Sequence, residues 1–251
     1  MGKATREAYG NALARIGKEN TNIIVLDADL SKSTKTDTFK AVCPERFFNV
    51  GIAEQNLISV GAGLAAAGKI PFVSSFSMFA TGRAFEQIRN AVCYPKLNVK
   101  VCATHAGITV GEDGATHQSL EDISCMRTLP NMTVVVPADE RETEAVIEWA
   151  ASYNGPVYVR LGRAGVDDVT TEGYSFVPGK STILVDGSDA TIIACGALVG
   201  PAVEASKTLS ESNISARVIN MASIKPIDAE AIIKAAAETG AIVTAEEHNI
   251  I

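Results

Sequence analysis

Short apolar runs alternate with longer amphipathic stretches along almost the whole chain. The short runs are rich in β-branched residues, and several are flanked by proline or glycine, as is typical of buried strands. They predict strands at Ile23–Leu26, Phe72–Ser75, Val99–Ala103, Thr133–Val136, Val157–Leu161, Thr191–Cys195, Ala216–Asn220 and Ala241–Ala245. The longer, alanine-rich stretches predict helices, the fourth of them capped by Asp139, at Arg6–Lys18, Glu54–Ala67, Arg83–Val92, Glu140–Ala151, Val199–Leu209 and Ala229–Ala237.

This alternation predicts an α/β fold in which mostly parallel sheets are covered by helices. The periodicity stops between Gly162 and Lys180, where polar and glycine-containing sequence takes over. We therefore expect two consecutive units, at residues 1–165 and 181–251, joined by a linker at 166–180. The second unit ends on a buried-type strand with no helix after it, so we expect it to be truncated or to be completed by a partner.

Composition narrows the class of protein. Of the 251 residues, 47% are hydrophobic but only 6% are aromatic, so the core must consist mainly of Ala, Val, Ile and Leu, as in parallel sheets. The net charge of −7 and the scattered Lys and Arg argue against nucleic acid as a partner. The five cysteines form no C-x-x-C pair, which favours a reducing compartment. The lack of a signal core, or of about 18 consecutive apolar residues, favours the cytoplasm and no membrane contact.

Chemically active side chains concentrate in residues 104–122, a polar segment that follows one of the predicted buried strands. It holds two of the three histidines, His105 and His117, and its glycines permit tight turns. Its acids are Glu112, Asp113, Glu121 and Asp122. A single such residue is more often part of a solvated surface loop. Two histidines and an acidic pair after a strand end favour a functional site, because ligands bind at the carboxyl ends of parallel strands.

Three further positions are candidates, each with a structural alternative. Glu54 begins a predicted helix, where an acid interacts favourably with the helix dipole but where a carboxylate can also bind a ring nitrogen. Phe76 and Phe79 precede the next predicted helix, so they are not easily explained as its buried face, and they can stack on a planar ring. Arg160 ends a predicted strand with Arg163 close behind, and either a bound phosphate or a structural ion pair would explain it.

Three segments resemble the transketolase family: Gly-Glu-Asp-Gly-Ala-Thr-His-Gln at 111–118, Gly-Ile-Ala-Glu-Gln-Asn at 51–56 and Arg-Ala-Phe-Glu-Gln-Ile-Arg at 83–89. More narrowly, the whole chain resembles the separate C-terminal subunit of a split transketolase. The resemblance implies a pyrimidine-binding domain followed by a C-terminal domain, both α/β. It also implies an enzyme that depends on thiamine diphosphate.

Roles for individual residues follow from the resemblance. Glu54 matches the glutamate that hydrogen-bonds N1′ of the thiamine diphosphate aminopyrimidine, and Phe76 and Phe79 match aromatics around that ring. His105 and His117 match histidines that face the oxygens of the substrate. The remaining matches are Asp113 for a sugar hydroxyl, Asp29 near the cofactor at a subunit contact, and Arg6, Ser33 and Arg160 for the sugar phosphate. Where some family members have a third aromatic, this chain has Thr81-Gly82.

The diphosphate site of the family has no counterpart in this sequence. In the family, a Gly-Asp-Gly motif and a more distant asparagine hold a divalent metal, and no Gly-Asp-Gly occurs here. Mg²⁺ requires oxygen ligands, so we expect another chain to supply them. The resemblance implies that this partner is the N-terminal transketolase subunit and that the assembly is a heterotetramer with a homodimeric core.

We therefore expect a transketolase subunit that transfers a two-carbon ketol unit between sugar phosphates and is inactive without its partner. Within the superfamily, the alternatives are 1-deoxyxylulose-5-phosphate synthase and the beta subunit of a 2-oxo-acid dehydrogenase. Residues 111–118 favour sugar substrates over the dehydrogenase. Two other classes stay open: a metal-dependent hydrolase with His105, Asp113 and His117 as ligands, and a non-catalytic paralogue.

Overall fold

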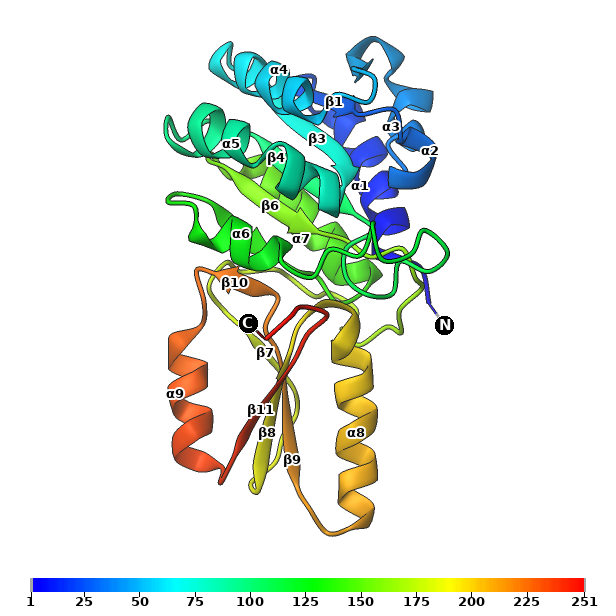
Figure 1. Ribbon diagram of the computed structural model, residues 1–251. Coiled ribbons are helices and arrows are strands. Elements are labelled where there is room, and N and C mark those ends of the chain that lie inside the picture. Colours follow the sequence, from blue (N-terminus) through cyan, green and yellow to red (C-terminus); the bar gives the residue numbers. More distant parts are fainter. Residues whose placement is uncertain (1, 251) are drawn as a thin grey trace.

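The computed structural model describes residues 2–250 and contains two β-sheets, one above the other in Figure 1. The larger sheet has seven strands, in the order β10 (Ser223–Lys225), β5 (Thr133–Val135), β6 (Val157–Arg160), β4 (Lys100–Thr104), β3 (Ile70–Phe76), β1 (Ile23–Asp27) and β2 (Phe47–Asn49). Its strands pair in parallel except β10, which is antiparallel to β5. Within residues 2–250, no helix is long and apolar enough to cross a membrane.

Helices cover both faces of this sheet (Figure 1). On one face, α1 (Thr5–Glu19), α3 (Asp37–Val42) and α7 (Glu140–Ser152) pack together over a core that includes Tyr9, Leu13, Phe39 and Val146. On the other face, α4 (Glu54–Ala66) and α6 (Asp122–Thr128) bury Leu57, Ile58 and Met126. The central strands are buried on both sides, which is why their sequences read as continuous apolar runs rather than alternating ones.

The smaller sheet consists of β11 (Ile242–Ala245), β8 (Ala190–Ala194), β9 (Ala216–Asn220) and β7 (Thr182–Val185). Its first three strands are parallel, and β7 lies antiparallel at the edge. Helices α8 (Val199–Glu211) and α9 (Ala229–Glu238) lie on opposite sides of it (Figure 1). The predicted α/β class, with mostly parallel sheets covered by helices, is confirmed.

One predicted helix differs from the structure. In place of a regular helix at Arg83–Val92, two π-helices, Met78–Arg83 and Ile88–Cys93, flank a short α5 (Phe85–Gln87). A π-helix widens the turn and changes the direction of its side chains, and such turns often occur at functional sites. Several short elements carry no periodic signal and were not predicted: α2 (Ser31–Thr34), α3, β2, α6, β7, β10 and the 3₁₀ turns Pro44–Arg46 and Gly196–Leu198.

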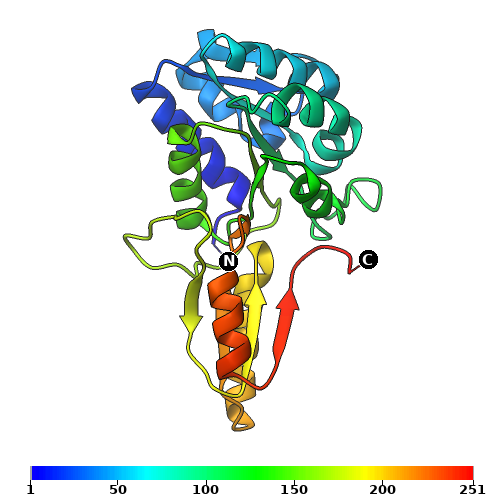
Figure 2. The same cartoon turned by 90° about the vertical axis from the view of Figure 1, so that its left-hand side faces the viewer.

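The two halves of the chain are interlocked. Strand β10 comes from the C-terminal half but completes the larger sheet at its edge. The irregular segment at 166–180 is held in place, because the backbone N–H groups of Val169 and Thr170 donate to the carboxylate of Asp139 at 2.9 and 2.7 Å. After β11 the chain turns back to the larger unit, where Asn249 N–H donates to the carbonyl of Leu120 at 2.9 Å (Figure 2). The structure therefore fixes the arrangement of the two units by backbone and side-chain contacts at several points.

Candidate active site

The candidate site lies at the carboxyl edge of the larger sheet, where ligands bind in open α/β folds. Phe76 is the last residue of β3, and His105 directly follows β4. His105 has a left-handed backbone, with φ of 59°, which turns the chain sharply out of the strand. Its Nδ1 lies 2.8 Å from Oγ1 of Thr104, so the imidazole ring is held in a fixed orientation.

Four of the predicted site residues form one cluster of rings. The ring of Phe76 stacks on His105 with centroids 3.8 Å apart, and it lies 6.3 Å from the nearly parallel ring of Phe79. His117 packs edge-on against Phe79 at 5.1 Å. The π-helical segment supplies Phe79, and the polar loop after β4 supplies His117. The structure thus brings together aromatic and imidazole groups from three separate segments, as a site for a planar ring requires.

His105 is electrically neutral near pH 7. Burial, together with the nearby charge of Arg6, lowers the pKa of His105 to about 4, although the carboxylate of Asp113 opposes the shift. Nη1 of Arg6 lies 3.4 Å from Nε2 of His105. Because arginine can only donate, Nε2 acts as the acceptor in this contact, and the ring proton lies on Nδ1 toward Thr104.

Arg6 is anchored from the first turn of α1. Its Nη1 donates to the backbone carbonyl of Ser33 at 2.9 Å, so the contact uses the main chain of Ser33 rather than its hydroxyl. The Nε of Arg6 is buried without a hydrogen-bond partner. Burial and the charge of Arg163 both lower the pKa of Arg6, while Asp113 raises it. Arg6, Ser33, His105, Asp113 and Arg163 therefore belong to one electrostatic neighbourhood.

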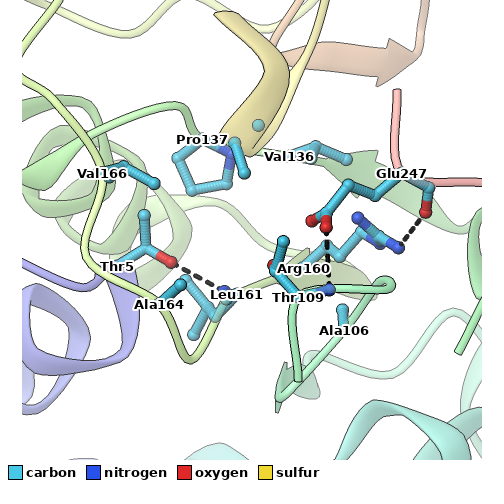
Figure 3. A pocket seen from close by; sticks show the side chains of 13 residues that line it. Thr5, Ala106, Thr109, Val136, Pro137, Arg160, Leu161, Ala164, Val166 and Glu247 are labelled. Atoms are coloured by element: carbon cyan, nitrogen blue, oxygen red, sulfur yellow. Dashed lines mark hydrogen bonds between the residues drawn. The ribbon is translucent and has the colours of Figure 1, made fainter. Parts of the chain in front are cut away.

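Arg160 does not have the environment that its predicted phosphate role requires. Its side chain is 5% exposed, and Nε and Nη2 donate to the carboxylate of Asp122 at 2.7 and 3.2 Å. The same Nη2 also donates to the carbonyl of Glu247 (Figure 3) and to that of Ser119. Burial opposes ionisation of both partners, yet their attraction raises the pKa of Arg160 and holds the pKa of Asp122 below its usual value. Of the two roles that the sequence left open for Arg160, the structural ion pair fits these contacts better than the bound phosphate.

Arg163 lies closer to the electrostatic centre of the site. It forms an ion pair with Glu112, and Nη1 donates to the carbonyl of Val110 at 2.5 Å. Its charge acts on both Arg6 and His105, lowering the pKa of each. The side chain is 30% exposed, so unlike Arg160 it can meet a ligand from solvent. We therefore transfer the candidate phosphate contact from Arg160 to Arg163.

Glu54 is a buried acid that is linked to the ring cluster through Arg83. It begins α4, is 2% exposed, and accepts a hydrogen bond from Arg83 Nη1 at 2.8 Å. Oγ of Ser75 lies 3.4 Å from its other oxygen. The guanidinium of Arg83 also lies over the ring of Phe79, 4.6 Å from its centroid. Sequence reasoning did not single out Arg83, although it begins the segment 83–89 that carries part of the family resemblance.

Asp29 is joined to a different part of the molecule. It has a left-handed backbone, with φ of 65°, and accepts a hydrogen bond from Nδ2 of Asn49 at 2.7 Å. Its neighbour Asp27 is fully buried and binds the hydroxyls of Thr34 and Thr36, which holds the α2 turn in place. Asp29 itself is exposed, two residues beyond β1.

The three proposed metal ligands of the hydrolase alternative do not form a metal site. Across the described residues 2–250, no group of three or more His, Cys, Asp or Glu side chains could hold a metal ion. His105 instead contacts Phe76 and Arg6, and His117 contacts Phe79. The geometry therefore favours hydrogen bonding and ring stacking over metal ligation for these histidines.

Comparison with known proteins gives the family. The chain matches the model of the transketolase pyrimidine binding domain over residues 1–167 and that of the transketolase C-terminal domain over residues 179–251. It is 55% identical, over 251 residues, to a Methanocaldococcus jannaschii protein named as a transketolase C-terminal section; 99% of this chain and 78% of that one are covered. It is 42% identical, over 247 residues, to an apulose-4-phosphate transketolase subunit of Phocaeicola vulgatus, with 98% and 79% covered.

Solved structures agree with this result. A split-gene transketolase, described as an inactive beta4 tetramer, matches with a TM-score of 0.93 at 58% identity, over 100% of this chain and 82% of that one. Transketolase from Leishmania mexicana matches with a TM-score of 0.87 at 30% identity, over 98% of this chain but only 38% of that one. The fold is that of a transketolase pyrimidine-binding domain joined to a second α/β domain. The chain belongs to the transketolase family, and the resemblance found in the sequence is confirmed.

Proposed function

We propose that this chain is the catalytic subunit of a split transketolase, which transfers a two-carbon ketol unit between sugar phosphates with thiamine diphosphate. The observation that carries the proposal is the convergence of a buried carboxylate, paired aromatic rings and two loop histidines at one sheet edge. The family depends on thiamine diphosphate, and relatives named as transketolase subunits cover almost the whole chain. The sugar substrates and the need for a partner are parts of the proposal.

The buried carboxylate fits the aminopyrimidine ring of thiamine diphosphate. Glu54 is held at the start of α4 by Arg83, whose guanidinium also lies over the ring of Phe79. A carboxylate can accept further hydrogen bonds beyond those that Glu54 makes here. We assign it the N1′ atom of the ring, with Phe76 and Phe79 packing against the ring faces. When bound, thiamine diphosphate supplies the carbon nucleophile that attacks a ketose carbonyl. The task of Glu54 is to hold a proton at N1′.

The other half of the site fits a sugar phosphate. Burying the unpaired Nε of Arg6 costs free energy, and an anion between Arg6 and Arg163 would supply an acceptor and screen the two positive charges from each other. His117 can donate a hydrogen bond to a sugar oxygen, whereas Nε2 of His105 and the carboxylate of Asp113 can each accept one from a sugar hydroxyl. We therefore assign the phosphate to Arg6, Arg163 and the Ser33 turn, and the sugar chain to the two histidines and Asp113.

The diphosphate and its Mg²⁺ need a second chain. Oxygen ligands for Mg²⁺ are expected on the N-terminal transketolase subunit, because this sequence has no Gly-Asp-Gly motif. A solved relative that consists of this type of subunit alone is described as inactive. We infer a heterotetramer in which two copies of this chain form the core.

The proposal is tested by reconstitution. We expect the purified chain alone to show no ketol transfer and the chain with its N-terminal partner, thiamine diphosphate and Mg²⁺ to transfer a ketol unit from a ketose phosphate to an aldose phosphate. Pyruvate as the donor tests the 1-deoxyxylulose-5-phosphate synthase alternative in the same assay. Turnover by the chain free of any partner would refute the subunit assignment. No turnover by the complete assembly would support the non-catalytic alternative.

The role of Glu54 has its own test in the reconstituted enzyme. Glu54→Gln should slow exchange of the cofactor C2 proton on the order of 10²-fold or more, because the amide cannot hold the proton at N1′ in the same way. Glu230→Gln is the matched control, since Glu230 is exposed in α9 and pairs only with Lys180 among the described contacts. C2-proton exchange at the wild-type rate in the Glu54 variant would contradict the assignment.

A further inference from the structure

We infer that Glu247, in the second unit, is a positioning residue that holds the substrate loop of the first unit in its working conformation. The inference rests on the proposed function, because the loop at 107–119 carries Asp113 and His117. Glu247 lies in the chain segment that leaves β11 and turns back toward the larger sheet (Figures 1 and 2). It is 7% exposed, whereas Glu246 before it is exposed.

The contact joins a side chain of one unit to the main chain of the other. Oε1 of Glu247 accepts a hydrogen bond from the backbone N–H of Thr109 at 3.0 Å (Figure 3). Thr109 lies in the first part of the loop, two residues beyond the bridge that Gly107 makes with Ser119 at the base. A carboxylate that accepts from a backbone N–H forms a charge-assisted hydrogen bond, which is stronger than a neutral one. This bond therefore fixes the direction in which the loop leaves its base.

Gly107 shows how closely the two segments fit. A Cβ atom at this position would lie 2.5 Å from Oε2 and 2.7 Å from Cδ of Glu247, and its φ of 86° is one that glycine adopts without strain. The backbone of the loop therefore packs directly on the carboxylate. Burying a carboxylate is costly unless it is hydrogen-bonded. The hydrogen bond from the Thr109 N–H offsets part of this cost, so the buried position of the carboxylate depends on the position of the loop backbone.

A second group holds the same junction from the other side. Nη2 of Arg160 donates to the carbonyl of Glu247 at 2.8 Å and to that of Ser119 at 3.2 Å. The C-terminal segment and the base of the loop are thereby fixed to one guanidinium, and the Glu247 side chain adds a contact beyond the base. Arg163 binds the next residue of the loop, Val110, through its carbonyl. The loop is therefore held between Glu247 and Arg163 before it reaches Asp113.

The test uses the chain reconstituted with its partner and three variants at this position. Glu247→Ala removes the acceptor, and Glu247→Asp keeps the charge but shortens its reach. Glu247→Gln keeps an acceptor oxygen in place. We expect the Ala and Asp variants to lose roughly 10- to 100-fold in kcat/KM for sugar phosphates, because small misplacements of substrate-binding groups have effects of this size. The Gln variant should recover most of the loss, and Glu246→Ala should behave as the wild type.

Two further measurements separate positioning from a general structural role. Exchange of the cofactor C2 proton depends on Glu54 and should stay within about twofold of the wild-type rate in all variants, since the loop does not act in it. Backbone hydrogen exchange of peptides within 106–119, measured on the chain itself, should speed up in Glu247→Ala and Glu247→Asp but not in Glu246→Ala. Equal loss of C2-proton exchange and of sugar turnover would mean general unfolding and would overturn the inference.

The outcomes also distinguish this inference from the proposed function. If the loop exchanges faster but kcat/KM for sugar phosphates is unchanged, the contact exists and does not position the substrate, so the inference is wrong while the enzyme assignment stands. If loop exchange is unchanged in Glu247→Ala, the inference is wrong at its structural step. If the wild-type assembly transfers no ketol unit, the proposed function fails, and the loop-exchange comparison still confirms or refutes the control of the loop by Glu247.

Discussion

Replacing Asp122 with asparagine should destabilise the fold more than any single change at the surface. Asp122 is fully buried and its carboxylate accepts hydrogen bonds from Nε of Arg160 at 2.7 Å and from the hydroxyl of Tyr158 at 2.6 Å. The asparagine variant keeps one acceptor oxygen but leaves the guanidinium charge of Arg160 buried without a counter-charge. Removing one partner of a buried ion pair typically costs about 3–5 kcal/mol. Because one acceptor remains, we expect a loss of about 3 kcal/mol in the free energy of unfolding.

Urea unfolding of the isolated chain measures this loss. Trp149, the single tryptophan, lies on α7 of the larger unit against Tyr153 and Phe176, so its fluorescence reports on that unit. With a slope of about 2–3 kcal/mol per M, the midpoint should fall by about 1–1.5 M at an unchanged slope. A double variant, Asp122→Leu with Arg160→Met, should recover part of the loss because it leaves no unpaired charge. An Asp122→Asn midpoint within about 0.2 M of the wild type, equivalent to about 0.5 kcal/mol, would refute the reasoning.

The pH dependence gives an independent check of the same pair. Burial alone would raise the pKa of Asp122, but Arg160 holds it below the usual value of 3.8. The folded state thus binds this proton less tightly than the unfolded state does. The carboxylate contributes stability that is fully present above the unfolded pKa and is lost as the pH falls through the folded pKa. The free energies of unfolding of the wild type and of Asp122→Asn should therefore differ most near neutral pH and become similar in acid.

Three further changes test other parts of the molecule. Arg163→Ala should raise KM for phosphorylated substrates about 30- to 150-fold more than KM for unphosphorylated ones, because a charge-assisted contact contributes roughly 2–3 kcal/mol. An equal rise in KM for both classes of substrate would exclude the phosphate role. Burial lowers the pKa of Lys100 to about 7, so between that pH and 10.5 the unfolded state binds more protons than the folded state does. The free energy of unfolding, measured in urea, should therefore rise as the pH increases across this window, and Lys100→Met should remove the rise. Asp139→Ala removes the cap of α7 and the acceptor for the N–H of Thr170, so it should lower the free energy of unfolding by about 1–2 kcal/mol and expose residues 166–180 to proteases. Unchanged proteolysis would show that other contacts hold this segment.

The sequence predicts most of the regular fold because the main strands are buried on both faces and the long helices are amphipathic. Strand β4 and helix α7 lie within one or two residues of their predicted bounds. Strand β10 was missed because three residues carry no periodic signal, and its pairing with β5 is decided by tertiary contact. The π-helices were missed for a similar reason, since their apolar positions fit a regular helix equally well.

For the site, the sequence identifies which residues lie at the sheet edge but not which way each side chain points. Phe76 ends β3 and His105 directly follows the neighbouring β4, so their meeting is a consequence of parallel strand order. Arg160 also ends a strand, yet its guanidinium turns inward to Asp122, which lies 38 positions away and carries no signal of that pairing. Arg163, three residues further on, lies beyond the strand, and its charge acts on Arg6 and His105. Strand-end position alone therefore cannot separate a ligand-binding arginine from a structural one.

The inward turn of Arg160 explains why a second unit is useful to a site built on the first. A loop at a sheet edge leaves backbone N–H and carbonyl groups without strand partners, and each must find one elsewhere. Here Thr109 finds its acceptor in Glu247 and Ser119 its donor in Arg160. The acceptor for Thr109, Glu247, is a side chain of the second unit. The guanidinium of Arg160 also donates to the main-chain carbonyl of Glu247 in that unit. The second unit thus supplies hydrogen-bond partners that the edge of the larger sheet lacks, and the loop with Asp113 and His117 is ordered at the junction between the two units.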